Sequence, residues 1–196
     1  IIISTESQRP FECDGLAVYQ QLPLVTVIPE TVDQVQAILR LCHLHRVPLV
    51  PRGAGTGLCA GAMPHAEGVL LVMSKLDKIL HINQNTATAT VQPGVRNLAL
   101  TDAAQPFGLY YAPDPSSQIA CTIGGNVAEN SGGVHCLKYG LTVNNLLQVT
   151  MITIEGQVII LGGEGLDEPG MDLLSLVVGS EGLLGVVVEA KVKLLP

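Results

Sequence analysis

Apolar residues recur at helical spacing after the first β-branched segment of the chain. Val25 to Ile28 is rich in β-branched residues and predicts a strand. Thr31 then stands at the start of a helix as a capping residue, and the helix is expected to end near His45-Arg46. The apolar positions of this helix are Val32, Val35, Ile38, Leu39 and Cys42.

Two short apolar runs flank a glycine-rich segment in the next part of the chain. Val47 to Val50 and Val69 to Met73 are typical of buried strands, and the loop at Gly53 to Gly61 lies between them. The first third of the sequence therefore predicts the order strand, helix, strand, loop, strand.

The pattern changes from Thr86 onward. Thr86 to Val91 alternates polar and small apolar residues, as a half-buried strand does, and Val95 to Pro106 suggests a helix. Leu147 to Ile154 and Val158 to Leu161 flank Glu155-Gly156-Gln157 as a hairpin, and Val186 to Leu195 is a further strand. The prediction is an α+β fold with a small parallel β/α subdomain, about residues 20–81, and a larger subdomain with a mixed or antiparallel sheet, about 82–196.

Composition narrows the class of protein. The 196 residues are 47% hydrophobic and 14% charged and include 21 glycines, which predicts a folded chain with many tight turns. The longest apolar stretch, Leu173 to Val188, is short and contains Glu181 and several glycines, so no membrane span is expected. The net charge of -7 argues against nucleic acid as a partner.

The cysteines and the N-terminal residues give an expectation for the cellular location of the protein. Five cysteines without a C-x-x-C pair argue against a disulfide framework or a zinc cluster, and a cytoplasmic location is expected. The chain opens at Ile1 without the pattern of a targeting peptide, so we expect a trimmed boundary there.

The first glycine loop, Pro51 to Gly57, directly follows a predicted strand. Alternating glycines allow successive backbone N–H groups to point into one concavity, where Arg52 and Thr56 add a charge and a hydroxyl for a pyrophosphate. A tight surface turn is the simpler alternative. A second alternative is an NAD-binding Rossmann module, because Gly55 to Ala60 matches G-x-G-x-x-A and Asp77 follows. That fold requires a helix directly after the glycines, and Gly61, Pro64 and Gly68 interrupt one.

Three later loops also carry glycine with small polar side chains. They are Pro113 to Gln118, Thr122 to Gly133 and Gly179 to Val187. Hydroxyl and amide groups in such loops can bond the heteroatoms of a flat ligand, although ordinary Asx and Ser turns would look the same.

Taken together, in this order and spacing, the four loops resemble the FAD-binding domain of the vanillyl-alcohol oxidase and p-cresol methylhydroxylase family. The closest resemblance is to its members of glycolate oxidase and D-lactate dehydrogenase type, and it extends from Phe11 to the end of the chain, with Lys138-Tyr139-Gly140 as a further shared motif. It implies noncovalent FAD, because the loop from Gly53 to Gly61 has no histidine for covalent attachment. The implied cofactor-binding residues are Pro51, Arg52, Gly53, Ala54, Gly55, Thr56, Gly57, Pro113, Asp114, Ser116, Ser117, Thr122, Gly124, Gly125, Asn126, Asn130, Gly132, Gly133, Glu181, Gly182, Gly185 and Val187.

The resemblance also implies an activity, the oxidation of a 2-hydroxy acid by hydride transfer to flavin. In such relatives the substrate binds in a following cap domain, which we expect to lie beyond Pro196, so this chain alone is expected to be inactive and to need that domain, with other oxidase subunits as partners. We predict no catalytic residue and no metal ligand here; His135 is the one histidine placed in a flavin-facing loop. Alternatives on the same fold are a reductase of an enolpyruvyl sugar nucleotide, an oxidase that uses oxygen, and a subunit that binds FAD without turnover.

Overall fold

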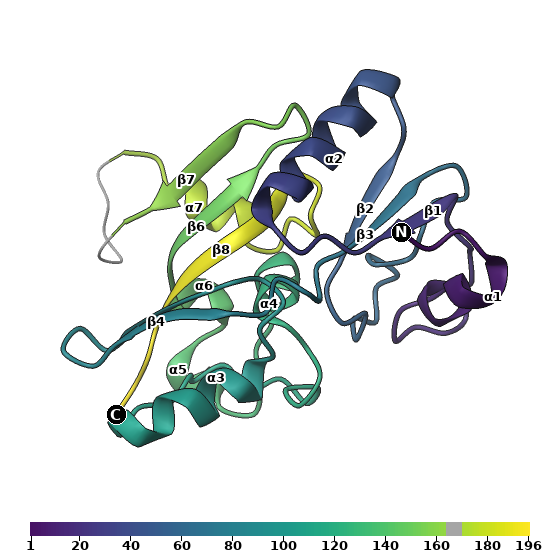
Figure 1. The fold of residues 1–196 in the computed structure, drawn as a ribbon. Coiled ribbons are helices and arrows are strands. Elements are labelled where there is room, and N and C mark those ends of the chain that lie inside the picture. The colour runs from purple at the N-terminus through teal and green to yellow at the C-terminus, as the bar shows by residue number, and fades with distance from the viewer. Residues whose placement is uncertain (164–169) are drawn as a thin grey trace.

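The computed structural model describes residues 1–163 and 170–196 and contains two β-sheets joined by a shared core (Figure 1). A three-stranded sheet has the order β1-β3-β2, and a five-stranded sheet has the order β4-β5-β8-β6-β7. The strands are β1 (Val25–Val27), β2 (Leu49–Arg52), β3 (Val69–Val72), β4 (Ile79–Asn83), β5 (Thr88–Val91), β6 (Leu146–Ile152), β7 (Val158–Gly162) and β8 (Val186–Lys193). The helices are α1 (Thr5–Gln8), η1 (Arg9–Phe11), α2 (Val32–His45), α3 (Asn97–Ala104), η2 (Gln105–Phe107), α4 (Ile123–Glu129), α5 (Cys136–Tyr139), α6 (Thr142–Asn145) and α7 (Leu173–Val177).

The smaller sheet is parallel and the larger one is antiparallel, which confirms the predicted α+β class. In the smaller sheet β3 lies in the middle, with Val69 beside both Val25 and Leu49. In the larger sheet β8 is central and pairs antiparallel with β5 and β6. The predicted hairpin is also confirmed, since β6 and β7 pair antiparallel from Ile152 and Val158.

Helix α2 forms where its sequence pattern predicts. The Thr31 side chain accepts a hydrogen bond from the Gln34 N–H at 3.3 Å and caps the helix. Val35, Leu39 and Cys42 are buried along one face, and the helix ends at Arg46 in a left-handed conformation. Figure 1 shows α2 alongside β6 and β8, and Gln36 Nε2 donates to the Gly156 carbonyl of the β6–β7 turn at 2.8 Å.

One apolar cluster connects the two sheets. Val35 and Leu39 of α2 pack with Leu71 of the smaller sheet and with Ile152 and Val188 of the larger one. A second and larger cluster lies on the five-stranded sheet under α3 and α4. The five-stranded sheet begins at Ile79, and a subdomain boundary near residue 82 stays a prediction.

Several elements differ from the sequence prediction for physical reasons. The strand predicted at Val47 begins at Leu49, because the Val47 N–H bonds the Cys42 carbonyl at the end of α2. Strand β2 includes Pro51, which an edge strand tolerates because one side of it needs no donor. Strand β4 was not predicted; it lies at the edge of its sheet with Leu80 and His81 exposed, so its apolar signal is weak.

The segment that follows β2 excludes the Rossmann alternative. Residues 53–68 are all described and contain no helix between β2 and β3, whereas dinucleotide binding of that kind requires one directly after the glycines. A helix that was not predicted forms within Thr122 to Gly133. This segment was expected to be a loop, but its residues Ile123–Glu129 form helix α4.

Candidate functional site

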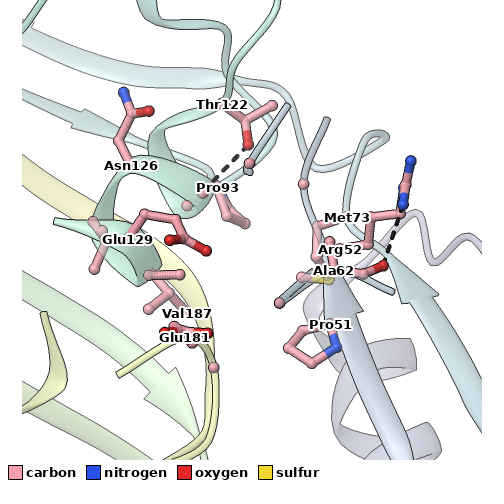
Figure 2. Close-up of a pocket in the computed structure, with 18 of the residues that line it drawn as sticks. Pro51, Arg52, Ala62, Met73, Pro93, Thr122, Asn126, Glu129, Glu181 and Val187 are labelled. Atoms are coloured by element: carbon pink, nitrogen blue, oxygen red, sulfur yellow. Dashed lines mark hydrogen bonds between the residues drawn. The ribbon is translucent and has the colours of Figure 1, made fainter. Parts of the chain in front are cut away.

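A cavity of about 290 Å³ lies between the carboxyl end of β2 and helix α4. One side is the segment Pro51 to Gly57, here called the loop wall, and the opposite side is α4, here called the helix wall. The segment Ser180 to Val187 closes the lower part (Figure 2). Carboxyl ends of parallel strands are a common place for ligand sites, and β2 and β3 both end here.

The loop wall is supported by a buried arginine. Arg52 is 7% exposed, and its Nη1 donates to the carbonyls of Cys13 at 2.7 Å and Ala62 at 3.2 Å. The pKa of Arg52 is lowered by burial, an effect that Cys13 and Asp14 partly oppose. Figure 2 shows the guanidinium on the side turned away from Asn126 and Glu129, so Arg52 supports the loop from behind. Its role toward a pyrophosphate stays a prediction.

The helix wall begins at a capping residue. The Thr122 hydroxyl accepts a hydrogen bond from the Gly125 N–H at 3.4 Å, and a Cβ on Gly53 of the loop wall would lie only 2.5 Å from that hydroxyl. A Cβ on Gly124 would lie 2.6 Å from the Pro93 Cβ. Glycine at these positions therefore permits the backbone to lie close to the side chains of Thr122 and Pro93.

The closing segment is tied to the helix wall by its backbone. The N–H groups of Gly179 and Glu181 each donate at 2.9 Å, to the carbonyls of Val127 and Ala128. Glu181 and Gly182 have positive φ values of 54° and 78°, so the chain turns sharply. A Cβ on Gly182 would lie 2.5 Å from Pro51 Cγ, which brings this segment against the loop wall.

Carboxylates gather at one part of the cavity. Glu129 and Glu181 both line it, and Figure 2 shows them on the same side of the gap between the walls. The pKa of Glu129 is raised, first by burial and then by the negative charges of Glu181 and Asp14.

Most residues implied by the family resemblance meet in this cavity. Those that line it are Pro51, Arg52, Gly53, Ala54, Gly55, Thr56, Gly57, Ser117, Thr122, Gly124, Gly125, Asn126, Glu181, Gly182, Gly185 and Val187. Those that are not among its lining residues are Pro113, Asp114, Ser116, Asn130, Gly132 and Gly133.

The residues outside the cavity have contacts of their own. Asp114 accepts from His135, with 2.6 Å between Oδ2 and Nδ1. Gly133 packs so closely on Asp114 that no side chain fits there, and Gly132 is similarly close to Leu141. Asn130 ends α4 in a left-handed conformation, and the Pro113 carbonyl accepts from the Asn97 side chain at 2.9 Å. Ser116 is exposed.

Several lining residues were not predicted. Met73, Pro93 and Cys121 line the cavity from buried positions, and Ala62 and Glu129 complete the mouth. The position of Met73 could have been predicted from the sequence. It follows strand β3, which is parallel to β2, so its carboxyl end lies at the same edge of the sheet as that of β2. Glu129 stood within the glycine-rich stretch that the sequence analysis singled out.

The titratable groups of the described residues do not form a metal site. Within residues 1–163 and 170–196, no three His, Cys, Asp or Glu side chains are placed to hold a metal ion. The five cysteines are free thiols, and burial raises the pKa of Cys121 in the cavity wall. No helix among the described residues is long and apolar enough to cross a bilayer.

The profile of a known family, described as the FAD binding domain, matches residues 23–162. The chain belongs to this family. FAD is accordingly the cofactor of this domain.

Curated relatives align with the FAD binding domain over nearly its whole length. The glycolate oxidase subunit GlcD of Escherichia coli (strain K12) is 60% identical over 196 residues, which are 100% of this chain and 39% of the relative. The GlcD subunit of Bacillus subtilis (strain 168) is 45% identical over 98% of this chain and 41% of the relative. A D-lactate dehydrogenase of Anaerostipes hadrus is 35% identical over 100% of this chain and 42% of the relative. The chain thus spans about two fifths of the length of these relatives.

Solved structures share the fold. An alkyldihydroxyacetonephosphate synthase superposes with a TM-score of 0.86 at 23% identity, over 99% of this chain and 37% of that one. This match, together with the match to the FAD binding domain, confirms that the fold is of the vanillyl-alcohol oxidase and p-cresol methylhydroxylase type.

The cavity of the FAD binding domain fits part of a flavin dinucleotide. Ligand sites commonly hold about 300–1,000 Å³, and the volume of this cavity lies just below that range. Gly53, Gly57 and Gly125 expose backbone rather than side chains to it, which permits close approach of a phosphate or a ring. The Asn126 Nδ2, buried in the wall, has no hydrogen-bond partner among the described residues.

Proposed function

We propose that FAD binds noncovalently in this cavity and that the chain is the FAD-binding part of an oxidoreductase for a 2-hydroxy acid of glycolate or D-lactate type. The identity of 60% to a glycolate oxidase subunit over the whole chain carries the proposal. The relatives named D-lactate dehydrogenase and D-2-hydroxyglutarate dehydrogenase support the same class of substrate over an enolpyruvyl sugar nucleotide.

We assign a separate role in cofactor binding to each wall of the cavity. The backbone N–H groups of Gly53 to Gly57 would hold the pyrophosphate, and the small residues of α4 would let the cofactor lie close to the helix. FAD itself would accept a hydride from the carbon that bears the substrate hydroxyl. The remaining length of the relatives would supply the substrate-binding groups.

The proposal extends to partners and location. A relative named as a subunit of glycolate oxidase supports assembly with other subunits of an oxidase complex. Cytoplasmic location is proposed from the unpaired cysteines, which suit a reducing compartment.

Retention of flavin tests the first half of the proposal. The purified chain is mixed with FAD, passed through gel filtration and examined for flavin absorption, with NAD as the control ligand. We expect FAD to co-elute and to be released by acid precipitation, as noncovalent flavin is. Elution without flavin, or flavin that stays with the acid precipitate, would contradict this half.

Reduction of the flavin tests the second half. The full-length holoprotein is mixed without oxygen with glycolate, D-lactate or L-lactate. We expect a 2-hydroxy acid to bleach the flavin absorption. A flavin that every 2-hydroxy acid leaves oxidised would count against this substrate class and favour a subunit that binds FAD without turnover.

A further inference from the structure

Two glutamates that line the cavity and one buried aspartate lie close together beside the end of the loop wall. A Cβ on Gly61 would lie 3.0 Å from Glu181 Oε2 and 3.3 Å from Glu129 Oε1. A Cβ on Gly57 would lie 3.7 Å from Glu129 Oε1 and 3.9 Å from Asp14 Oδ2. Glu129 therefore lies near both glycines, with Glu181 beside it at Gly61 and Asp14 beside it at Gly57.

The three carboxylates differ in how their charge is compensated: Asp14 lies within electrostatic reach of the Arg52 guanidinium, whereas the two glutamates have no ion-pair partner among the described residues. Among residues 1–163 and 170–196, neither Glu129 nor Glu181 forms a salt bridge. Asp14 is 6% exposed; its Oδ1 accepts from the Leu16 N–H, and its Oδ2 is buried without a partner. A buried acceptor with no donor is costly, so the structure leaves acceptor capacity unused at this place.

The position of the carboxylates restricts which ligand group can donate hydrogen bonds to them. Their neighbour Gly57 ends the segment expected to hold the pyrophosphate, and Gly61 follows it in the same glycine-rich loop. A phosphate placed directly against Glu129 and Glu181 would be repelled. A neutral group that donates hydrogen bonds and is bonded next to a phosphate fits instead. FAD has two such groups beside its pyrophosphate, the ribityl chain of the flavin half and the ribose of the AMP half with its 2′- and 3′-hydroxyls. Only the ribose is also present in ADP, so its binding can be tested without the flavin.

We propose that Glu129 and Glu181 accept hydrogen bonds from the ribose hydroxyls of the AMP half of FAD and so select for an unmodified ribose. Both side chains are exposed at the cavity mouth, where a ligand reaches them. Asp14, behind them, adds negative potential that disfavours a phosphate on the 2′-oxygen. This inference rests on the proposed position of FAD.

The selection is measured with ligands that lack the flavin. Isothermal titration compares ADP, 2′-deoxy-ADP and 3′-deoxy-ADP with the wild-type chain and with Glu129→Ala and Glu181→Ala, with Glu67→Ala as a control for loss of one negative charge. Glu67 is exposed and is not among the lining residues of the cavity. Because loss of a carboxylate also relieves repulsion of the phosphates, the informative quantity is the affinity ratio of ADP to each deoxy analogue.

We expect wild type and Glu67→Ala to prefer ADP over at least one deoxy analogue by about tenfold, the range for a hydrogen bond to a charged acceptor. That ratio should fall close to one in Glu129→Ala or Glu181→Ala, while circular dichroism shows an intact fold. Adenosine 2′,5′-bisphosphate should bind more weakly than AMP, its matched ligand without the 2′-phosphate, to wild type.

Two results would overturn the inference while leaving FAD binding intact. One is an unchanged ratio in both glutamate variants. The other is ADP binding that disappears when divalent cations are chelated, since the carboxylates would then hold a metal ion. Failure of the chain to bind FAD at all would instead refute the proposed position of the cofactor.

Discussion

The loop wall and the helix wall both contain closely spaced glycines, but the glycines serve different purposes. In the loop wall Gly55 has a φ of 71°, so the residue is needed for the backbone conformation itself. In the helix wall Gly124 and Gly125 lie within α4, and Gly124 is needed because Pro93 occupies the place of a side chain. The same composition thus produces a turn on one side of the cavity and a helix packed at close range on the other.

The largest expected effect is on the loop wall, from the loss of its buried guanidinium. Arg52→Met leaves the carbonyls of Cys13 and Ala62 without their donor, so the free energy of unfolding should fall by about 2–4 kcal/mol. Urea denaturation measures this. The exposed Arg96→Met is the control and should change it by less than about 0.5 kcal/mol. Equal losses in the two variants would show that Arg52 does not support the loop.

A matched pair of glycines tests the packing of the helix wall. Gly124→Ala forces a Cβ against Pro93 and should lower the free energy of unfolding by about 1–3 kcal/mol. Gly125→Ala meets only the Thr122 hydroxyl at 3.3 Å, and alanine favours a helix, so its effect should be near zero. Chemical denaturation of both variants checks this. Similar losses would mean that the two glycines share one role.

The cap of the helix wall should have a smaller effect. Thr122→Ala removes the acceptor for the Gly125 N–H and should cost about 1 kcal/mol, whereas Thr122→Ser keeps it. Hydrogen exchange should speed up in the first turn of α4 in the alanine variant alone. Unchanged exchange there would contradict the capping role.

The smallest expected effect concerns the carboxylate of Glu129. Its pKa is raised in the folded chain, so the native state binds the proton more tightly than the unfolded state, and stability falls as pH rises through that pKa. Glu129→Gln should therefore stabilise the ligand-free chain at neutral pH, by less than about 1 kcal/mol because the residue is exposed. Thermal melts across pH measure this. A variant that is less stable than wild type above that pKa would reverse the sign.

The sequence predicted elements with strong periodicity and missed those that depend on tertiary contacts. Helix α2 follows from its capping Thr31 and its apolar face, and the β6–β7 hairpin follows from Gly156 between two apolar runs. Helix α4 was expected as a loop, because Gly124 and Gly125 weaken a helix in isolation. Its packing against Pro93 is a long-range contact that no local pattern records.

As with the fold, only part of the site could be predicted from the sequence. Family resemblance indicated the residues of both walls, because the motifs stand in sequence order. It did not show that the Arg52 guanidinium bonds the carbonyls of Cys13 and Ala62, or that Asp114 pairs with His135 outside the cavity, since both depend on side-chain direction. Met73 and Glu129 were missed for the same reason.

A crystal structure of this chain with FAD would test the central claim most directly. We expect density for the pyrophosphate on the N–H groups of Gly53 to Gly57, with α4 on the opposite side and the AMP ribose beside Glu129 and Glu181. Density for FAD at any other surface, with this cavity filled only by solvent, would contradict the account.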